Sequence, residues 1–415
     1  MIARIRSWLA RPSGLAKAGP VDPIMAAVSI ALLGFGIVMV YSASTVEAAV
    51  GFGDPQYYLK RQAAFGVGAL VVMVLVSRFD YHRLRPLTYP ILGAVTLMLM
   101  LSVMGFGHSG GGATRWLRLG PIHIQPSEAA KLGLVLWLAY SLAKKKERVK
   151  SFSVGMLPHL IMAGGLILLC LKQPDFGGSV VLLFLTFTLL FVAGARLGYL
   201  LGVGILGAIA AGWLVQSQLY RMHRIMAFMD MTRYRHDLAY QPFQSVMSFG
   251  SGGWFGLGLG NGLQVLYLPE AHTDFVSAII GEELGFFGIL MLISAYLVIV
   301  VQGVRAALRS ADDYGAYIAF GISVLFGIQA LVNLAVAMSM LPTKGLTLPF
   351  ISYGGSSLLV NAAAMGVLLN TSRERRRALA FGVDDPKGKS PEASALVLGR
   401  SGFGGGHPGA VGEDE

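Results

Sequence analysis

The sequence predicts an all-α polytopic membrane protein of about ten transmembrane helices, with a large extracytoplasmic loop between spans 7 and 8. Of its 415 residues, 54% are hydrophobic and only 13% are charged, whereas a soluble globular domain carries about 25% charged residues. The apolar residues are gathered in runs of about 17–25 residues, the length that crosses a bilayer as a helix. The basic residues lie mostly between these runs.

Alternation of ten spans predicts the orientation of the chain. With the N-terminus in the cytoplasm, the inner segments carry 19 Lys and Arg residues and the outer segments carry 10. The positive-inside rule therefore places both termini in the cytoplasm, and it explains the net charge of +11 without a nucleic-acid partner. The expected spans are residues 24–43, 62–77, 88–106, 127–143, 153–171, 177–193, 198–217, 284–303, 316–339 and 355–371.

These spans divide the chain into three parts. We expect a basic cytoplasmic N-terminal tail at 1–23, a transmembrane domain at 24–371 with its outer loop at 218–283, and a cytoplasmic tail at 372–415 that is basic and then disordered. The N-terminal apolar run has no small-residue cleavage site after it, so no cleavable signal peptide is expected. A single cysteine, Cys170, excludes an intramolecular disulfide and a Cys/His zinc site.

Most of the unusual polar motifs lie in the predicted outer segments, so we expect a functional surface that faces away from the cytoplasm. ATP and nucleotide sugars are then unsuitable substrates. One such motif places glycine at alternate positions from Gly256 to Gly262. A glycine-rich loop can bind phosphate through its backbone N–H groups. No Lys-Ser/Thr pair follows, however, so a flexible or tightly packed loop is the favoured interpretation.

Glu270, His272 and Asp274 form the second motif. An extended segment would point all three side chains to one side, whereas a helix would align Glu270 with Asp274. Either arrangement suits a general base or an oxygen-rich site for a divalent cation such as Mg or Mn near Asp274, with ligands that the sequence does not specify. The alternative is a solvated loop in which Thr273 or Asp274 caps the following helix.

Further carboxylates lie beside or within the apolar runs. Glu282 and Glu283 precede the predicted span at 284–303. An ionised group at the centre of a span costs about 2.5–3.5 kcal/mol, so we expect these two at the interface, in a water-filled cavity or at a surface helix start. Glu128 and Lys131 are three residues apart, which predicts an intramembrane ion pair at a polar cavity, unless Lys131 extends to the membrane surface.

Two further segments are consistent with turns. Asp175 follows Gln173 and Pro174, where a turn and a helix cap are the simplest interpretation. Residues 352–357, SYGGSS, follow Lys344 and suggest a turn into a helix with a small-residue packing face.

Taken together, the ordered motifs resemble one family. The segments are TRWLRLG, QPSEAAKL, KQPDFGGS, YQPFQSVMSFGSGGWFGLGLG, YLPEAHTDFVSAIIGEELGFFG, LPTKGLTLPFISYGGSS and LLNTSRERR. They are similar to the SEDS family, the shape, elongation, division and sporulation proteins of bacteria, over about residues 24–377. The PTKGLTLPF segment resembles the cell-division branch more than the elongation branch.

The resemblance implies a ten-span peptidoglycan glycosyltransferase of the bacterial inner membrane, acting at the division septum. It implies lipid II and the nascent glycan strand as substrates, with membrane lipids, a class B penicillin-binding protein and other division proteins as partners. Asp274 matches the family's proposed catalytic residue, and Glu128, Lys131 and Asp175 match its other charged positions. We expect Arg61, Arg115, Lys131, Lys344 or a divalent cation to offset charge on the leaving diphosphate, and Ser356 and Ser357 to line the cavity. Glu270, His272, Glu282 and Glu283 are secondary candidates. A lipid II flippase and a non-catalytic division scaffold remain the alternatives.

Overall fold

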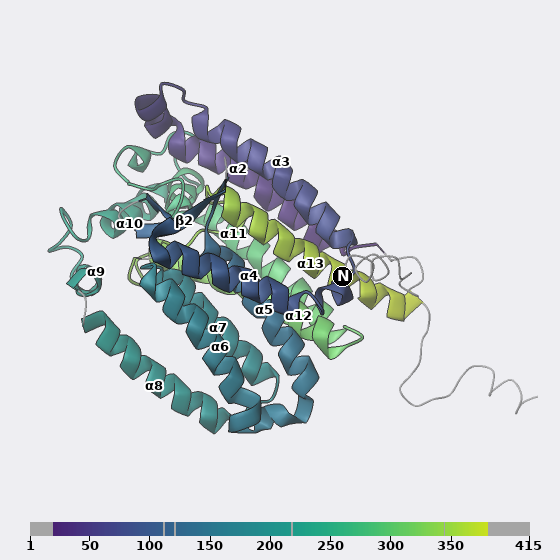
Figure 1. The fold of residues 1–415 in the computed structure, drawn as a ribbon. Helices are drawn as coiled ribbons and strands as arrows, with labels where there is room; N and C mark the ends of the chain where they lie inside the picture. Colours follow the sequence, from purple (N-terminus) through teal and green to yellow (C-terminus); the bar gives the residue numbers. More distant parts are fainter. Residues whose placement is uncertain (1–19, 111–112, 120–121, 217–218, 344, 381–415) are drawn as a thin grey trace, which may run out of the picture.

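The protein is a bundle of long helices, described here from a computed structural model that covers residues 20–110, 113–119, 122–216, 219–343 and 345–380 (Figure 1). The helical prediction is confirmed. The α-helices are α2 (Pro23–Phe52), α3 (Tyr57–Arg78), α4 (Thr88–Leu101), α5 (Pro126–Lys145), α6 (Leu157–Lys172), α7 (Phe176–Val192), α8 (Leu197–Gln216), α9 (Leu219–Met229), α10 (Tyr240–Gly252), α11 (Val276–Leu308), α12 (Asp313–Ala337) and α13 (Gly355–Ala380). Short 3₁₀ or π-helical turns lie at Tyr81–Leu84, Ser102–Phe106, Lys146–Lys150, Phe152–Met156 and Gln264–Leu266.

Within the described residues, six helical stretches are long and apolar enough to cross a membrane: Pro23–Phe52, Tyr57–Arg78, Thr88–Phe106, Phe152–Lys172, Val276–Leu308 and Asp313–Ala337. Phe176–Val192 and Leu197–Ala210 are shorter apolar helices. Each of the ten predicted spans overlaps one α-helix of the structure. The predicted spans at 127–143 and 355–371 overlap α5 and α13, which are not among the helices just named. Helix α5 carries Glu128 and Lys131.

The predicted boundary at residue 284 is wrong. Helix α11 begins eight residues earlier, at Val276, and is broken at Gly285, whose φ of 65° and ψ of −160° are not helical. A side chain at this φ would be strained, so glycine permits the break. Glu282 and Glu283 therefore lie inside the first part of α11, where both are buried, and not at a surface helix start.

A small sheet also departs from the all-α expectation. Strands β1 (His108–Gly110), β2 (Ala113–Leu119) and β3 (Ile122–Ile124) form an antiparallel sheet in the order β1-β2-β3. Leu117 pairs with Ile124 and Leu119 with Ile122. The segment lies between two predicted spans, and its backbone groups pair with each other, as such groups generally do away from water.

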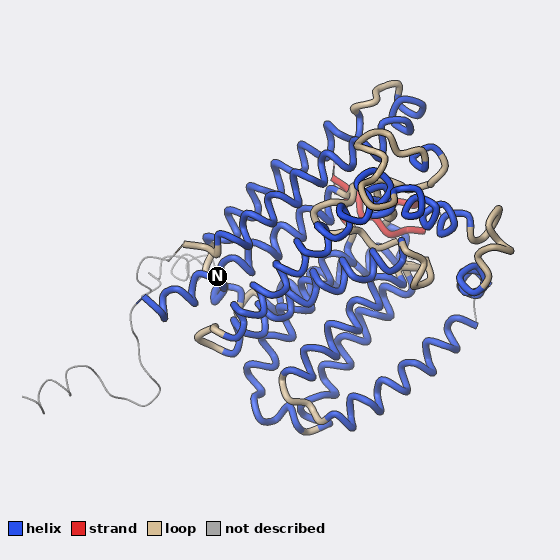
Figure 2. The backbone as a smooth tube through the Cα atoms, turned by 180° about the vertical axis from the view of Figure 1, so that it is seen from behind, coloured by secondary structure: helices blue, strands red, loops and turns tan. Residues whose placement is uncertain are grey.

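Several short elements gather at one end of the bundle. The strands, α9, α10 and several long loops lie together there (Figure 2), so the predicted outer loop at 218–283 is partly helical. The described part of the chain begins at α2 and finishes at α13. Both of these points lie at the end of the bundle opposite the strands (Figure 1). The predicted tails at 1–19 and 381–415 lie outside the described residues.

Two apolar clusters hold the bundle together. One is built mainly from α2, α11, α12 and α13, with Phe326 and Ile322 among its fully buried members. The second joins α4, α5, α6 and α7 through residues such as Leu134 and Leu138. Gly36 of α2 lets the 345–354 loop approach closely, because a β-carbon there would overlap the carbonyl oxygen of Phe350.

Candidate functional site

A cavity of about 1050 Å³ is lined by residues from the end of the bundle that carries the strands and long loops. Its walls come from the end of α2, the start of α3, β2 to α5, the α6–α7 turn, the 270–274 turn and the 342–356 loop. This size is at the upper end of ordinary small-molecule pockets. Seven of the residues singled out from the sequence line it: Arg61, Glu128, Asp175, Glu270, His272, Asp274 and Ser356.

Asp274 lies half-buried in the cavity wall, two residues before α11 begins. The Asn333 side chain of α12 fixes its backbone, because Nδ2 donates to the carbonyl oxygen of Asp274 at 3.0 Å and to that of Leu346 at 2.7 Å. Asn333 Oδ1 accepts a hydrogen bond from Ser277 at 2.9 Å. One buried amide thus joins the two loops that flank the Asp274 side chain.

Gly345 completes the immediate surroundings of the Asp274 carboxylate. A β-carbon at Gly345 would lie 2.8 Å from Asp274 Oδ2, which is shorter than an ordinary van der Waals contact. The absence of a side chain at Gly345 therefore provides the space that the carboxylate occupies.

His272 forms a second group in the cavity with residues from α2 and α3. Its Nδ1 lies 3.3 Å from Glu47 Oε2, and its ring lies 4.5 Å from the ring of Tyr58. The backbone N–H of Tyr353 donates to the His272 carbonyl oxygen at 2.9 Å. Burial raises the pKa of Tyr353, against a smaller lowering by its hydrogen bond with Arg61. His272 thereby connects the 270–274 turn to α2, to α3 and to the loop that contains Tyr353.

Burial lowers the pKa of His272 below its usual 6.5, although Glu47 and Glu270 act in the opposite direction. A histidine whose folded pKa is lowered stabilises the fold above the unfolded pKa, and this stability is lost as the pH falls. We expect wild type to lose stability relative to His272→Gln below about pH 6.5, by at most ~1.4 kcal/mol per pH unit. Unfolding midpoints from pH 8 to 5 measure this. His223→Gln, at an exposed position of α9, is the control, and parallel profiles for wild type and His272→Gln would contradict the expectation.

Glu128 and Lys131 lie on the other side of the cavity, in the first turns of α5. Lys131 Nζ contacts Glu128 Oε1 at 2.7 Å, and the two side chains are only 1% and 5% exposed. Pro126 begins the helix, so this pair sits at the point where α5 enters the bundle. Glu128 lines the cavity, while Lys131 lies behind it among the packed helices.

Asp175 has both of the roles considered for it. Its Oδ1 accepts from the Gly178 backbone N–H at 2.8 Å, which caps α7, and the residue also lines the cavity. Ser356 lines the cavity and accepts a hydrogen bond from the Gln125 backbone at 3.3 Å. Ser357 does not line it; its hydroxyl is 2.9 Å from that of Thr347, a lining residue.

Glu282 and Glu283 are buried and do not line the cavity, so of the three surroundings considered for them the structure does not show a surface helix start. Glu282 Oε1 accepts from the backbone of Leu263 at 2.8 Å and of Gln264 at 3.1 Å. Glu283 accepts from the Ser42 hydroxyl at 2.6 Å. These carboxylates hold the loop that contains Gly256–Gly262 against α11, so their role in the structure is to fix this loop. The loop is packed against α11, which is one of the two forms that the favoured interpretation allowed.

Two further candidates from the sequence are the basic residues Lys344 and Arg115. Lys344 lies outside the described residues, as does the side chain of Arg115. Among the described residues, no group of three or more His, Cys, Asp or Glu side chains is arranged to hold a metal ion. A closed metal cage built by the described chain alone is therefore not available near Asp274.

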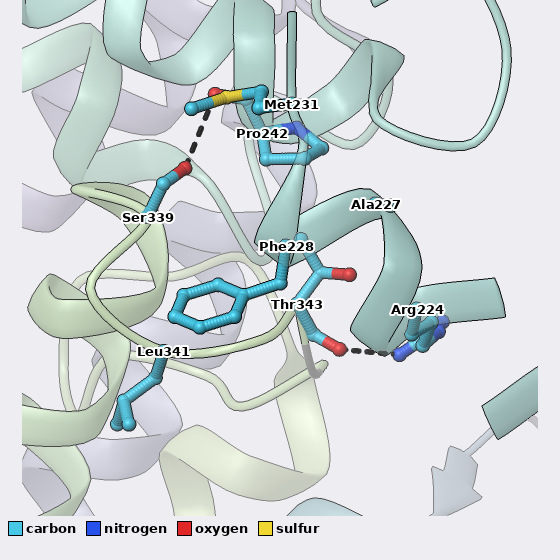
Figure 3. Close-up of a pocket in the computed structure, with 8 residues that line it drawn as sticks. All are labelled: Arg224, Ala227, Phe228, Met231, Pro242, Ser339, Leu341 and Thr343. Atoms are coloured by element: carbon cyan, nitrogen blue, oxygen red, sulfur yellow. Dashed lines mark hydrogen bonds between the residues drawn. The ribbon is translucent and has the colours of Figure 1, made fainter. Parts of the chain in front are cut away.

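Several lining residues were not singled out from the sequence. These are Glu47, Tyr58, His123 and Arg224. Glu47 could have been recognised from the sequence as a candidate, because it is a lone carboxylate just after the predicted first span. Arg224 also reaches a neighbouring pocket (Figure 3), where its Nη1 donates to the Thr343 carbonyl oxygen at 2.6 Å. That pocket holds about 10 Å³, about the space of one water, so its importance lies in joining α9 to the 339–343 loop.

The chain is similar to a set of bacterial proteins along most of its length. The family model of the FtsW, RodA and SpoVE cell cycle proteins matches residues 23–377. A probable peptidoglycan glycosyltransferase FtsW of Trichlorobacter lovleyi is 44% identical over 365 residues, covering 88% of this chain and 96% of that protein. The corresponding protein of a Geobacter species (strain M18) is 42% identical over 359 residues, covering 86% and 98%.

Solved structures agree with these relatives. The chain matches a chain from a peptidoglycan synthase complex, described as coordinating polymerization and crosslinking, with a TM-score of 0.72 and 30% identity over 86% of this chain and 98% of that one. It also matches the rod shape determining protein RodA of Thermus thermophilus, with a TM-score of 0.64 and 31% identity over 88% and 99%.

Proposed function

Because the chain belongs to the FtsW, RodA and SpoVE family of cell cycle proteins, the SEDS family, we propose that it is a peptidoglycan glycosyltransferase that polymerises lipid II. The observation that carries this proposal is the large cavity, lined in part by charged side chains, with Asp274 in its wall. Relatives more than 40% identical bear the name of this activity. These relatives are of the division type, FtsW, which favours a role in cell division over one in elongation.

Asp274 is the proposed general base. Its carboxylate takes the proton from the 4-hydroxyl of the acceptor sugar, and the hydroxyl oxygen forms a bond with the anomeric carbon of the donor. The bond between that carbon and the lipid diphosphate breaks, and the diphosphate leaves with its negative charge. We propose direct inversion without a covalent enzyme intermediate. A trapped glycosyl adduct on Asp274 would overturn this step.

Arg61 and Arg224 both line the cavity. We propose that their positive charges offset the negative charge of the leaving diphosphate. Arginine binds phosphate oxygens through its planar fork of donors. Lys131 is less suited to this role because it is buried and paired with Glu128. Lys344 and Arg115 remain further candidates from the sequence.

We propose that a divalent cation, Mg or Mn, binds at the site only when substrate is present. Mg²⁺ is usually held by one or two carboxylates plus substrate phosphates, and Asp274 and Glu270 offer carboxylates on one wall of the cavity. Such a cation would supply positive charge to the diphosphate. We expect Mn²⁺ to bind the purified protein measurably only after a lipid diphosphate is added, and a chelator to stop polymerisation. Equally tight Mn²⁺ binding by the substrate-free protein would contradict the expectation.

We propose that Asn333 positions Asp274 for this reaction. Replacing Asn333 with Ala removes both donors to the flanking loops, and a misplacement of about 1 Å can cost 10²-fold in rate. We expect kcat to fall about 10–100-fold with little change in KM. Ser277→Ala is the matched control, since it removes only the hydroxyl that donates to Asn333. Equal losses in both variants, or a loss confined to KM, would contradict a positioning role.

We place the cavity on the outer face of the cytoplasmic membrane, with ten spans, both termini in the cytoplasm and the protein at the septum. The inner-side loops predicted from the positive-inside rule are the basic ones. A crosslinking partner of the class B penicillin-binding type is proposed from the complex to which the chain is structurally similar. Imaging of a tagged copy tests the septal position.

The experiment that tests the activity uses purified protein in vesicles with labelled lipid II and the crosslinking partner. We expect wild type to produce glycan polymer. Movement of lipid II across the vesicle membrane without any polymer would instead support a flippase. Absence of both, together with rescue of growth by Asp274→Ala, would support a scaffold.

A further inference from the structure

A charge-free segment runs through the predicted outer loop. Residues 238–269 contain no Asp, Glu, Lys, Arg or His, although surface segments of soluble domains carry about a quarter charged residues. The segment includes α10 and the loop from Gly253 to Leu268, which we call the glycine-rich loop. Its composition suits hydrocarbon rather than water.

The glycine-rich loop exposes large apolar side chains. Trp254 is 66% exposed, Phe255 81% and Leu259 54%. Single exposed apolar residues are ordinary on protein surfaces, but a contiguous patch indicates a binding surface. Leu263 and Leu266 of the same loop are also exposed.

This patch is continuous with the exposed face of α11. The Trp254 ring lies 5.2 Å from that of Phe286, and the Phe255 ring lies 5.3 Å from that of Phe287. Both phenylalanines follow the break at Gly285 and lead into exposed residues of a helix long and apolar enough to span a membrane, such as Leu297. The surface that faces lipid along α11 therefore extends onto the loop.

Several backbone groups of the loop form hydrogen bonds with the broken helix. Leu257 N–H donates to the carbonyl oxygen of Glu282 at 3.0 Å, and Gly258 N–H donates to that of Glu283 at 2.9 Å. Phe286 N–H donates to Gly253 at 2.9 Å. Irregular backbone at membrane depth requires such internal partners, because hydrocarbon supplies none. The buried Glu282 carboxylate is satisfied by the same loop.

Helix α10 packs against the first part of α11 as membrane helices do, through small residues. A β-carbon at Gly252 would overlap the carbonyl oxygen of Gly281, and one at Gly256 would overlap that of Glu283. With 13 residues, α10 is about 20 Å long, too short to cross a hydrocarbon core of about 30 Å. An element of this length can enter one leaflet and return.

We propose that α10 and the glycine-rich loop form a re-entrant element, immersed in the hydrocarbon of one leaflet, with the bilayer itself as the partner of its apolar surface. Gln241 of α10 also lines the large cavity, so the immersed element connects the cavity wall with the lipid. This inference rests on the membrane fold and not on the proposed reaction.

Spin labelling of the purified full-length chain in lipid nanodiscs tests the proposal. Starting from Cys170→Ala, which removes the one cysteine, a nitroxide is attached after Phe255→Cys or Leu259→Cys. Leu297→Cys, on the exposed face of α11, is the lipid control, and Thr232→Cys, in an exposed polar turn, is the water control. Relaxation by lipid-soluble oxygen and by a water-soluble nickel chelate is compared at each site.

We expect the labels at 255 and 259 to resemble that at 297, with the ratio of oxygen to nickel accessibility at least several-fold above that at 232. Labels at 255 and 259 that resemble the one at 232 would overturn the proposal and indicate a surface reserved for a protein partner, since the chain is alone with lipid. Elution of each variant as a single folded species, and the agreement of two independent positions, guard against local damage by the substitution.

Discussion

Replacement of Asp274 by Asn is expected to reduce the rate of glycan polymerisation by about 10²–10⁴-fold, the contribution of a general base. Asparagine has nearly the same shape, so the backbone bond from Asn333 and the contact with Gly345 are kept. It cannot accept the hydroxyl proton at neutral pH. The fold and the binding of lipid II should therefore remain while the chemical step is lost. Initial rates with purified protein and labelled lipid II measure the effect.

Asp237→Asn provides the control for Asp274→Asn. Asp237 is an exposed carboxylate in the turn before α10, and it does not line the cavity. The control should polymerise at the wild-type rate. A normal rate for Asp274→Asn would refute its role as base.

Breaking the Glu128–Lys131 pair is expected to have the largest effect on stability. Removing one partner of a buried ion pair typically costs 3–5 kcal/mol, about the range expected here, because the other charge is left uncompensated. Glu128→Gln should cost more than Lys131→Met, since Lys131 is enclosed, whereas Glu128 borders the cavity, where water can solvate it. Unfolding free energies from detergent titration in mixed micelles measure both.

The double variant Glu128→Gln/Lys131→Met separates loss of a pair from loss of packing. With both charges removed, most of the stability should return, as is common when a buried pair is replaced as a unit. A double variant as unstable as the worse single variant would show that packing, and not the uncompensated charge, dominates. Polymerisation by the double variant then reports whether the pair also serves the reaction.

Features that depend on local pattern could be predicted from the sequence. Apolar runs fix where the helices lie, and the three-residue spacing of Glu128 and Lys131 anticipates an ion pair that the structure contains. Asp175, directly before an apolar run, caps α7 as such a residue often does. In each case the interacting groups are neighbours in the chain.

Features that depend on contacts between distant parts of the chain could not be predicted from the sequence. Glu47 meets His272, and Gln125 meets Ser356, across more than 200 residues. Nothing in either segment specifies its partner. The boundary at residue 284 was wrong because the break at Gly285 depends on the glycine-rich loop, which supplies hydrogen bonds to the interrupted helix. The same tertiary contacts turn Glu282 and Glu283 from candidate site residues into anchors.

The most direct measurement is a structure of the Asp274→Asn variant with lipid II bound, since that variant should bind substrate without consuming it. The account predicts sugar density in the large cavity, with the acceptor 4-hydroxyl within about 2.6–3.2 Å of the side chain at position 274. The diphosphate of the second lipid is predicted beside Arg61 or Arg224. Lipid II bound elsewhere on the bundle, with this cavity empty of sugar, would contradict the assignment of the cavity as the site of polymerisation.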